Sequence, residues 1–187
     1  MVLIMMTTSC VAPFFIPINH SRIPANSWRS NTFALMLENE DLLTQAIYEI
    51  ETQKTKLKRE DMNITSISFT SEGELIYRAH KTGDVGLEAR PFENEILRSV
   101  MELEGVSSIS LNENSIDFSL GGRGFGSATS YFGFCYLIGD DLAFAWGGIR
   151  HELTQHGEGW IWNETIGGNI YYIEKITGHF YYYELHY

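Results

Sequence analysis

The sequence predicts an α+β domain in which two helices pack on a mostly antiparallel sheet that ends in a C-terminal β-meander. Residues 38–60 and 91–104 carry apolar side chains at helical spacing. Short runs of β-branched and aromatic residues, bounded by turn residues, surround these two stretches. From residue 127 to the end the turn signals recur about every ten residues, which is typical of a meander or a small barrel.

The first 35 residues are expected to form a leader and an irregular tether, and one domain is expected over residues 36–187. Residues 1–10, MVLIMMTTSC, are apolar and then small, so Cys10 stands where a bacterial lipoprotein carries its lipid. Pro13, Pro17 and Pro24 favour irregular chain after it. The alternative is an untranslated or disordered leader.

Local signals at the helix ends support both predicted helices. Asn39 can cap the helix over 38–60, and the basic residues in its last turns complement the helix dipole. The helix over 91–104 is expected to begin at Pro91 and to stop before Gly105. Its expected apolar stripe consists of Phe92, Ile96, Val100 and Leu103.

The strands are predicted from alternation and turn chemistry. Residues 64–70 and 75–80 form one expected hairpin, and residues 106–111 and 115–120 form another. Four glycines between residues 121 and 126 predict a corner or bulge. A phosphate-binding loop is disfavoured because a strand, 127–138, follows them instead of a helix. The remaining expected strands are 142–146, 160–163, 170–176 and 180–187, with a long loop at 147–159.

The charge balance limits the partners that the chain can bind. It has 13 basic and 24 acidic residues, a formal net charge of −11. Such a surface repels phosphate backbones, so nucleic acid is not expected as a ligand, whereas a basic protein would be attracted. The two cysteines form no disulfide framework and no C-x-x-C zinc motif.

No motif predicts catalysis, a metal or a cofactor. His151 and His156 are five residues apart, not at the H-E-x-x-H spacing of a zinc protease. Asp140 and Asp141 suit a turn, and no G-x-S-x-G elbow is present. Cys135 is expected inside a strand as a buried thiol. The sequence cannot pair the remaining candidate carboxylates, which are Asp117, Glu158, Glu164, Glu174 and Glu184.

Aromatic residues are the remaining candidates for a binding surface. Trp160 and Trp162 share one face of their strand, as Tyr181 and Tyr183 do. Exposed rings beside carboxylates would suit a sugar or a protein partner. The alternative is that these rings only form cross-strand pairs that hold the sheet together.

The segments GGRGFGSATSYFGFCYLIGDD (121–141), GEGWIW (157–162) and NIYYIEKITGHFYYYELHY (169–187) stand in an order that resembles a group of small, uncharacterised bacterial proteins. Many members have lipoprotein-type leaders, so the resemblance implies the cell envelope. The first functional hypothesis is a non-enzymatic binding protein anchored through Cys10. The alternative is a cytoplasmic immunity or inhibitor protein that covers a basic protein. A weaker alternative is a carboxylate-dependent hydrolase.

Overall fold

Strands joined mostly by short turns build one long sheet in the computed structural model, which describes residues 26–84, 86–125, 128–139, 142, 144–146, 149–165 and 167–187. The helices are α1 (Asn26–Glu38), α2 (Glu40–Arg59) and α3 (Glu95–Met101). The strands of the long sheet are β1 (Met62–Phe69), β2 (Leu75–Lys81), β3 (Glu88–Pro91), β4 (Ser108–Leu111), β5 (Ser115–Phe125), β6 (Ala128–Leu137), β9 (Thr154–His156), β10 (Gly159–Asn163), β11 (Ile170–Thr177) and β12 (Phe180–His186).

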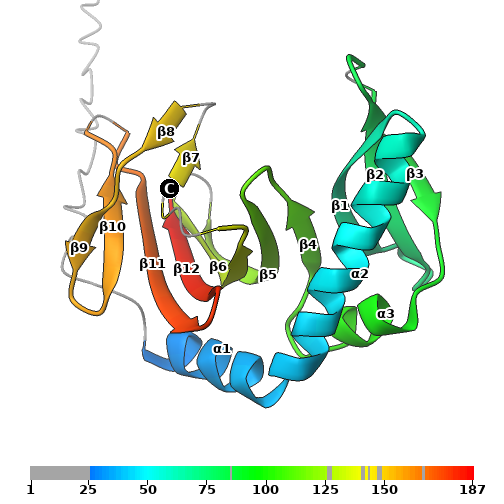
Figure 1. Ribbon diagram of the computed structural model, residues 1–187. Helices are drawn as coiled ribbons and strands as arrows, with labels where there is room; N and C mark the ends of the chain where they lie inside the picture. The colour runs from blue at the N-terminus through cyan, green and yellow to red at the C-terminus, as the bar shows by residue number, and fades with distance from the viewer. Residues whose placement is uncertain are drawn as a thin grey trace, which may run out of the picture.

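The ten strands found in the described ranges lie in the order β3-β2-β1-β4-β5-β6-β12-β11-β10-β9, and every neighbouring pair is antiparallel. A separate hairpin consists of β7 (Phe144–Trp146) and β8 (Ile149–His151). Figure 1 shows α1 beneath β11, β12 and β6 and α2 beside β1, with β3 and β9 at the two ends of the sheet. The predicted α+β class and the antiparallel sheet are confirmed, with three helices instead of two.

α1 corrects the expectation of an irregular tether for residues 26–35, because a helix begins at Asn26, while residues 1–25 lie outside the described residues. Long-range contacts hold it against β6 and β11. Trp28 stacks on Phe132 with ring centroids 4.5 Å apart, and Arg29 binds Glu174. Short helices gain most of their stability from such packing, so local sequence predicts them poorly.

α2 buries the apolar face that its periodicity predicts, namely Leu43, Ile47, Ile50 and Leu57. Asn39 stands at its N-cap, but the side-chain amide donates to the carbonyl of Leu35 and caps nothing.

α3 differs from its prediction at the N-terminal end. Asn94 is its cap, because the Asn94 side chain accepts a hydrogen bond from the backbone N–H of Leu97. Pro91 instead ends β3 opposite Ile76. Of the predicted stripe, only Val100 is fully buried, while Phe92, Ile96 and Leu103 are half-buried against the core.

The glycine-rich stretch is a bulge in a long hairpin. The β5–β6 register shifts between Ser119 and Gly121, and Gly121 has a φ of 139°. Glycine tolerates this left-handed backbone without strain. Gly126 lies outside the described residues.

The C-terminal strands form the expected meander, since β9, β10, β11 and β12 are successive neighbours. β12 then inserts between β11 and β6, so the end of the chain is a central strand. Tyr182 of β12 is completely buried. The expected loop at 147–159 instead contains β8 and β9.

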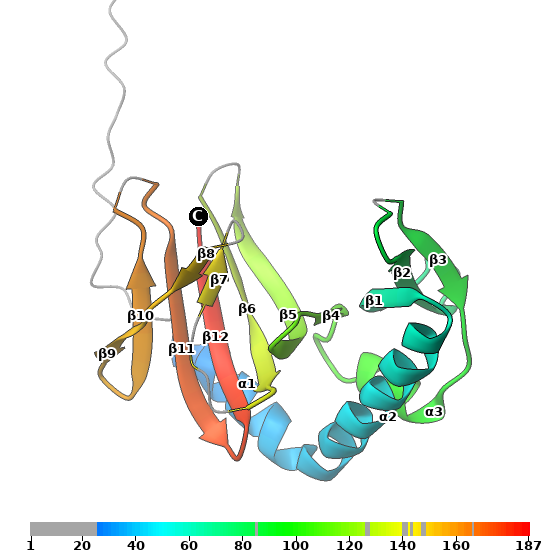
Figure 2. The ribbon, with the colours of Figure 1, turned by 45° about the horizontal axis from the view of Figure 1, so that its top comes forward.

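The helices cover one face of the sheet, and the main hydrophobic core lies between them and that face. On the opposite face a second cluster contains Cys135, Leu137, Ile173 and Tyr181. Leu142 and Leu153, which flank the β7–β8 hairpin, pack on this cluster. Figure 2 shows the hairpin in front of β11 and β12 on this side.

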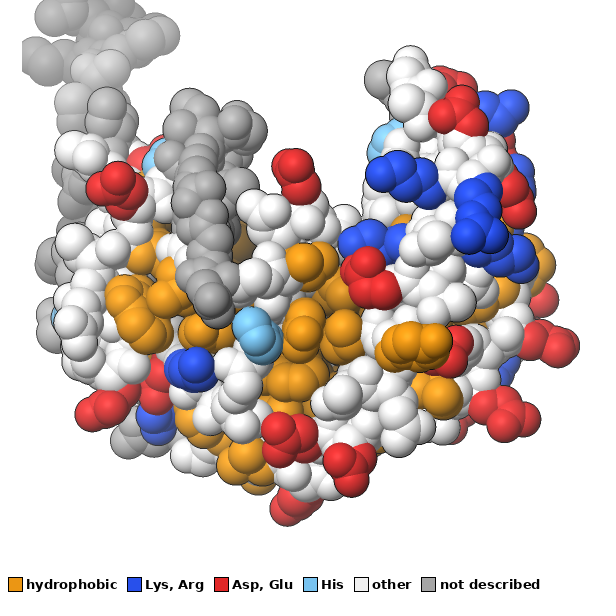
Figure 3. Space-filling model, in the orientation of Figure 1, with side chains coloured by type: hydrophobic (Ala, Val, Ile, Leu, Met, Phe, Trp, Pro, Cys, Tyr) orange, Lys and Arg blue, Asp and Glu red, His pale blue; other side chains and the backbone are white. Residues whose placement is uncertain are grey.

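Basic side chains gather at one end of the molecule. In Figure 3 the Lys and Arg residues concentrate over the arm built by α2, β2 and β3. They include the basic last turn of α2, formed by Lys56, Lys58 and Arg59. Cations at a helix C-terminus complement the helix dipole, as the sequence predicted.

Candidate functional site

The face of the sheet opposite the helices carries the candidate site, and we call it the pocket face. Directly paired residues of antiparallel strands point to the same side of a sheet. One such row crosses five strands and consists of Ser66, Ser110, Asp117, Cys135 and Tyr181. Its polar members lie on β1, β4 and β5, and its apolar members lie on β6 and β12. The pocket face is therefore polar at one side and apolar at the other.

A cavity of about 520 Å³ lies on this face where the two halves meet. Its polar wall comes from β4, β5 and the turn between them, and includes Ser108, Ser110, Asn112, Ser115, Asp117 and Ser119. Its apolar wall comes mainly from β6, β11 and β12, and includes Cys135, Leu137, Tyr171, Ile173, Tyr183 and Leu185. A volume of this size, with an apolar lining and a few convergent polar groups, is typical of small-molecule sites.

Asp117 is the carboxyl of the cavity lining whose pKa is clearly shifted. Burial raises the pKa of its carboxyl to about 6, although hydrogen bonds from Ser115 and Asn112 act in the opposite direction. The Asn112 amide donates to Oδ2 of Asp117 at 2.5 Å. Among the described residues that line the cavity, none is Lys, Arg or His. The charge of Asp117 is therefore solvated by neutral donors, without a cationic partner among the described residues of the cavity wall.

Cys135 stands directly opposite Asp117 in the β5–β6 register. Burial and the neighbouring Asp117 charge both raise the pKa of its thiol. The thiolate is the reactive form of cysteine, so this residue is held in its unreactive form. Cys135 therefore contributes apolar surface to the cavity and no nucleophile, as expected from its place in the strand.

Tyr183 reaches the cavity because its partner in the register is a glycine. It pairs with Gly133 of β6, and a Cβ atom on Gly133 would lie 2.9 Å from the Tyr183 hydroxyl and 2.1 Å from the carbonyl oxygen of Phe118. The tyrosine thus occupies the space that any other side chain at residue 133 would need. Its ring stacks with that of Tyr171 at a centroid distance of 6.4 Å.

The four aromatic residues singled out by the sequence all lie on the pocket face, but only one lines the cavity. Tyr183 does so. Tyr181 is buried in the second cluster, and Trp160 is half-buried against that cluster. Trp162 is half-buried, and its ring centroid lies 4.3 Å from the ring centroid of His151. Three of the four rings therefore pack mainly within the protein.

The sequence indicated the polar wall only indirectly. Ser115, Asp117 and Ser119 alternate with apolar residues along β5, which is the pattern of a strand with one polar face. Asp117 was one of several unpaired carboxylates in the sequence. Its surroundings depend on which strands lie beside β5, and local pattern does not contain that information.

A second polar cluster lies on the helix face, between β6 and β12. Glu184 is almost fully buried and accepts hydrogen bonds from the Tyr182 hydroxyl and from Nε2 of His186 at 2.9 Å. Nδ1 of His186 lies 2.7 Å from Oγ of Ser130. The three side chains of Ser130, His186 and Glu184 thus form a continuous line of hydrogen bonds.

A further ion pair lies near this cluster, under α1. Arg29 donates to both carboxylate oxygens of Glu174, and the Tyr172 hydroxyl donates to Oε2 at 2.8 Å. Burial raises the pKa of Glu174, but the hydrogen bonds from Arg29 and Tyr172 outweigh it, so the pKa is lowered overall. This group joins α1 to β11 and leaves the Glu174 carboxylate ionised.

Two further groups of sequence candidates are the histidines His151 and His156, and the residues Cys10, Asp140 and Asp141. His151 and His156 end β8 and β9, and the described residues include no group of three or more His, Cys, Asp or Glu that could hold a metal ion. Cys10, Asp140 and Asp141 lie outside the described residues. No helix within the described part of the chain is long and apolar enough to cross a membrane.

Comparisons with protein-family models, with curated proteins and with solved structures found no match.

Proposed function

We propose that this chain is a non-enzymatic binding protein whose ligand site is the cavity on the pocket face. The observation that carries the proposal is the cavity of about 520 Å³ whose apolar wall faces a polar wall containing Asp117. Pockets that combine an apolar lining with one perturbed titratable group are the usual form of a ligand site. The ligand is expected to be a small organic group with an apolar body and polar substituents.

Binding is favoured over catalysis by the groups that meet in the cavity. Acid–base hydrolysis of glycosides requires two carboxylates that face each other across the substrate. Here the raised pKa of Asp117 is not matched by a second carboxylate placed opposite, because its partner in the register is Cys135. The thiol is itself kept protonated at neutral pH. The other acidic residue of the described lining, Glu113, stands in the β4–β5 turn on the same wall as Asp117, so the two carboxylates do not face each other across a ligand.

A ligand-observed NMR screen of small organic molecules tests this proposal, with one variant that fills the cavity and one that does not. Ser110→Phe places a ring in the cavity wall and is expected to abolish binding of the molecules found. Ser66→Phe is the matched control, since Ser66 pairs with Ser110 on the same face but does not line the cavity. Binding that survives Ser110→Phe, or a screen without a single binder, would contradict the proposal.

We propose an envelope location separately from the cavity, and the leader is what supports it. Cys10 stands at the position that would carry lipid, and many of the bacterial proteins that the chain resembles have similar leaders. The mass of the mature chain from its native cell tests this location. Lipid on Cys10 is expected, whereas a chain that retains Met1 would indicate the cytoplasmic alternative.

The line formed by Ser130, His186 and Glu184 favours a second candidate function, a serine-type hydrolase. In this line Ser130 would be the nucleophile, His186 the general base and Glu184 the carboxylate that orients the base. This is the arrangement that activates a serine hydroxyl. Ser130 Oγ would attack an ester carbonyl while His186 takes its proton. His186 would then return the proton to the leaving alcohol, and water would release the acid from Ser130.

A fluorophosphonate probe tests this second candidate, because it forms a covalent bond only with an activated serine. The hydrolase candidate predicts labelling on Ser130 that is lost in Ser130→Ala and retained in the control Ser119→Ala, because Ser119 pairs with Gly133 on the opposite face of the sheet. An unlabelled protein would exclude the hydrolase and leave the cavity proposal intact. In that case the line of hydrogen bonds serves to satisfy the buried Glu184 carboxylate.

A further inference from the structure

Resting on the proposed binding function, we infer that the cavity takes a positively charged organic group, an ammonium or guanidinium on an apolar stem, with Asp117 as its counter-ion. The carboxylate of Asp117 faces the cavity and is hydrogen-bonded by the neutral amide of Asn112. Glu113, in the turn between β4 and β5, adds a second acidic side chain to the lining. None of the described lining residues is Lys, Arg or His, so the cavity wall contributes only negative formal charge.

The alternatives to a cation fit this lining poorly. An anionic ligand would meet the charge of Asp117 with no cation in the described lining to offset it, which costs free energy in a partly desolvated site. A neutral ligand would displace water from the Asp117 carboxylate without replacing the solvation that it loses. A cationic ligand instead makes a charge-assisted hydrogen bond with the carboxylate and favours its ionised form.

The rest of the cavity suits the remainder of such a ligand. Four tyrosines, Tyr131, Tyr171, Tyr183 and Tyr187, line it in two ring pairs with centroid distances of 5.8 and 6.4 Å. Aromatic faces attract ammonium and guanidinium groups through the ring quadrupole. Leu137 and Ile173 on the same wall provide contact for a short aliphatic stem.

Two sources supply this chemistry: a free organic amine, and the Lys or Arg side chain of a basic protein. The second source agrees with the net charge of −11, which attracts basic partners. The shared requirement is a cation that contacts Asp117, so the same variants test both sources. A partner's side chain is expected to bind more tightly when it is part of a chain that also contacts the acidic surface.

Calorimetric titration with three isosteric probes tests the inference on the full chain. The probes are n-hexylamine, n-hexanol and hexanoate, which are cationic, neutral and anionic at neutral pH. Hexylamine is expected to bind about 10- to 100-fold more tightly than hexanol, because one charge-assisted hydrogen bond is worth this factor. Hexanoate is expected to bind more weakly than hexanol.

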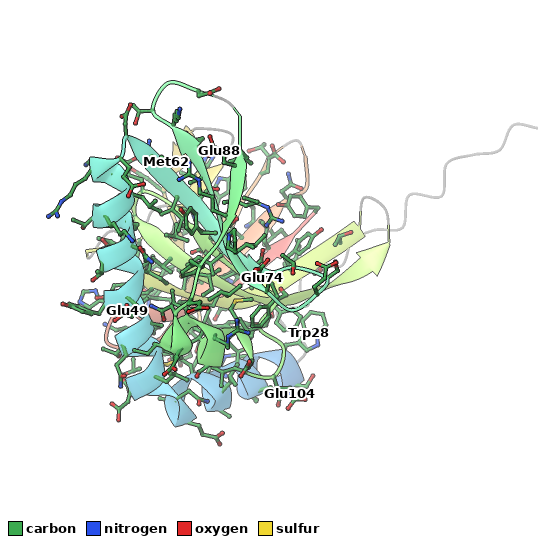
Figure 4. All side chains as sticks on the ribbon, turned by 90° about the vertical axis from the view of Figure 1, so that its right-hand side faces the viewer. Trp28, Glu49, Met62, Glu74, Glu88 and Glu104 are labelled. Atoms are coloured by element: carbon green, nitrogen blue, oxygen red, sulfur yellow. The ribbon has the colours of Figure 1, made fainter. Side chains whose placement is uncertain are left out.

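Asp117→Asn is the decisive variant, since it removes the charge and keeps the shape. It is expected to weaken hexylamine binding and to abolish the preference for hexylamine over hexanol, while hexanol binds at least as tightly as before because it no longer desolvates a carboxylate. Glu74→Gln is the matched control, because it removes one negative charge from an exposed residue that does not line the cavity (Figure 4). It is expected to change neither affinity.

The outcomes separate the inference from the function on which it rests. Equal binding of hexylamine and hexanol, blocked by Ser110→Phe, would keep the cavity as a binding site and overturn its preference for cations. Failure of every probe would count against the cavity itself. A decalysine peptide distinguishes the sources: tighter binding than hexylamine that is lost in Asp117→Asn but kept in Glu74→Gln indicates a protein side chain. Weaker binding of the peptide indicates a free amine.

Discussion

Arg29 of α1 donates two hydrogen bonds to the carboxylate of Glu174 on β11, a residue 145 positions further along the chain. The carboxylate is buried, whereas the Arg29 side chain is about one third exposed. Removing the arginine would leave a buried carboxylate that still accepts a hydrogen bond from the Tyr172 hydroxyl but has lost its cationic partner. The ion pair therefore couples the docking of α1 to the burial of Glu174.

Replacing Arg29 by Ala is expected to lower the free energy of unfolding by about 1–3 kcal/mol, less than for a fully buried pair because the arginine is partly exposed. The difference in free energy of unfolding between the natural chain and Arg29→Ala is expected to become smaller at low pH. Glu174 has a lowered pKa in the folded state, so its stabilisation is present above its ordinary pKa and is lost as pH falls. Urea unfolding at pH 7 and pH 4 measures both effects. The control is Arg90→Ala, which removes an exposed ion pair with Glu88 and should change the free energy of unfolding little.

The same contact explains why the sequence predicted α2 and missed α1. α2 shows a regular apolar stripe, and its predicted core residues are buried. The apolar residues of α1 lack such a stripe, and the helix is held by Trp28 on Phe132 and by Arg29 on Glu174. These partners lie over a hundred residues away, so no local pattern reports them.

The candidate site was predictable only to the level of single strands. Asp117 was predicted only as one of several candidate carboxylates, on a strand that the structure confirms, and the aromatic strands were assigned correctly. The cavity itself depends on the insertion of β12 beside β6, which places Tyr183 over Gly133. Such non-local pairing depends on packing of the whole sheet and is not encoded in a short window.

Replacing Gly133 by Ala is expected to destabilise the protein by about 2–3 kcal/mol. A Cβ atom there would lie 2.1 Å from the carbonyl oxygen of Phe118, and backbone of a central strand cannot move away at low cost. Gly86→Ala is the control, because its nearest neighbour would be an ordinary contact at 3.6 Å. Thermal unfolding of both variants measures the difference. Equal melting temperatures would show that the backbone of Phe118 does not approach Gly133 as closely as described.

Asp117→Asn is expected to stabilise the ligand-free protein above pH 6. The folded-state pKa of about 6 exceeds the ordinary value of 3.8. The carboxyl therefore contributes stability that is full below its ordinary pKa and is lost as pH rises through about 6. The neutral variant does not undergo this loss. Its free energy of unfolding should therefore exceed that of the natural chain by about 1–3 kcal/mol at pH 7.5 and by much less at pH 4. A difference that does not vary with pH would contradict the burial of this carboxylate.

Deleting residues 180–187 is expected to unfold or aggregate the protein, although chain ends usually tolerate trimming. The deleted segment contains β12, which pairs with β6 on one edge and with β11 on the other. Its loss would open two strand edges in the middle of the sheet and remove the fully buried Tyr182 from the core. Circular dichroism and gel filtration of the truncated chain measure the outcome. Removing Tyr187 alone is the control, and it should leave the sheet intact because it follows the last residue of β12. If the chain without residues 180–187 melts at the temperature of the full chain, the central position of β12 is wrong.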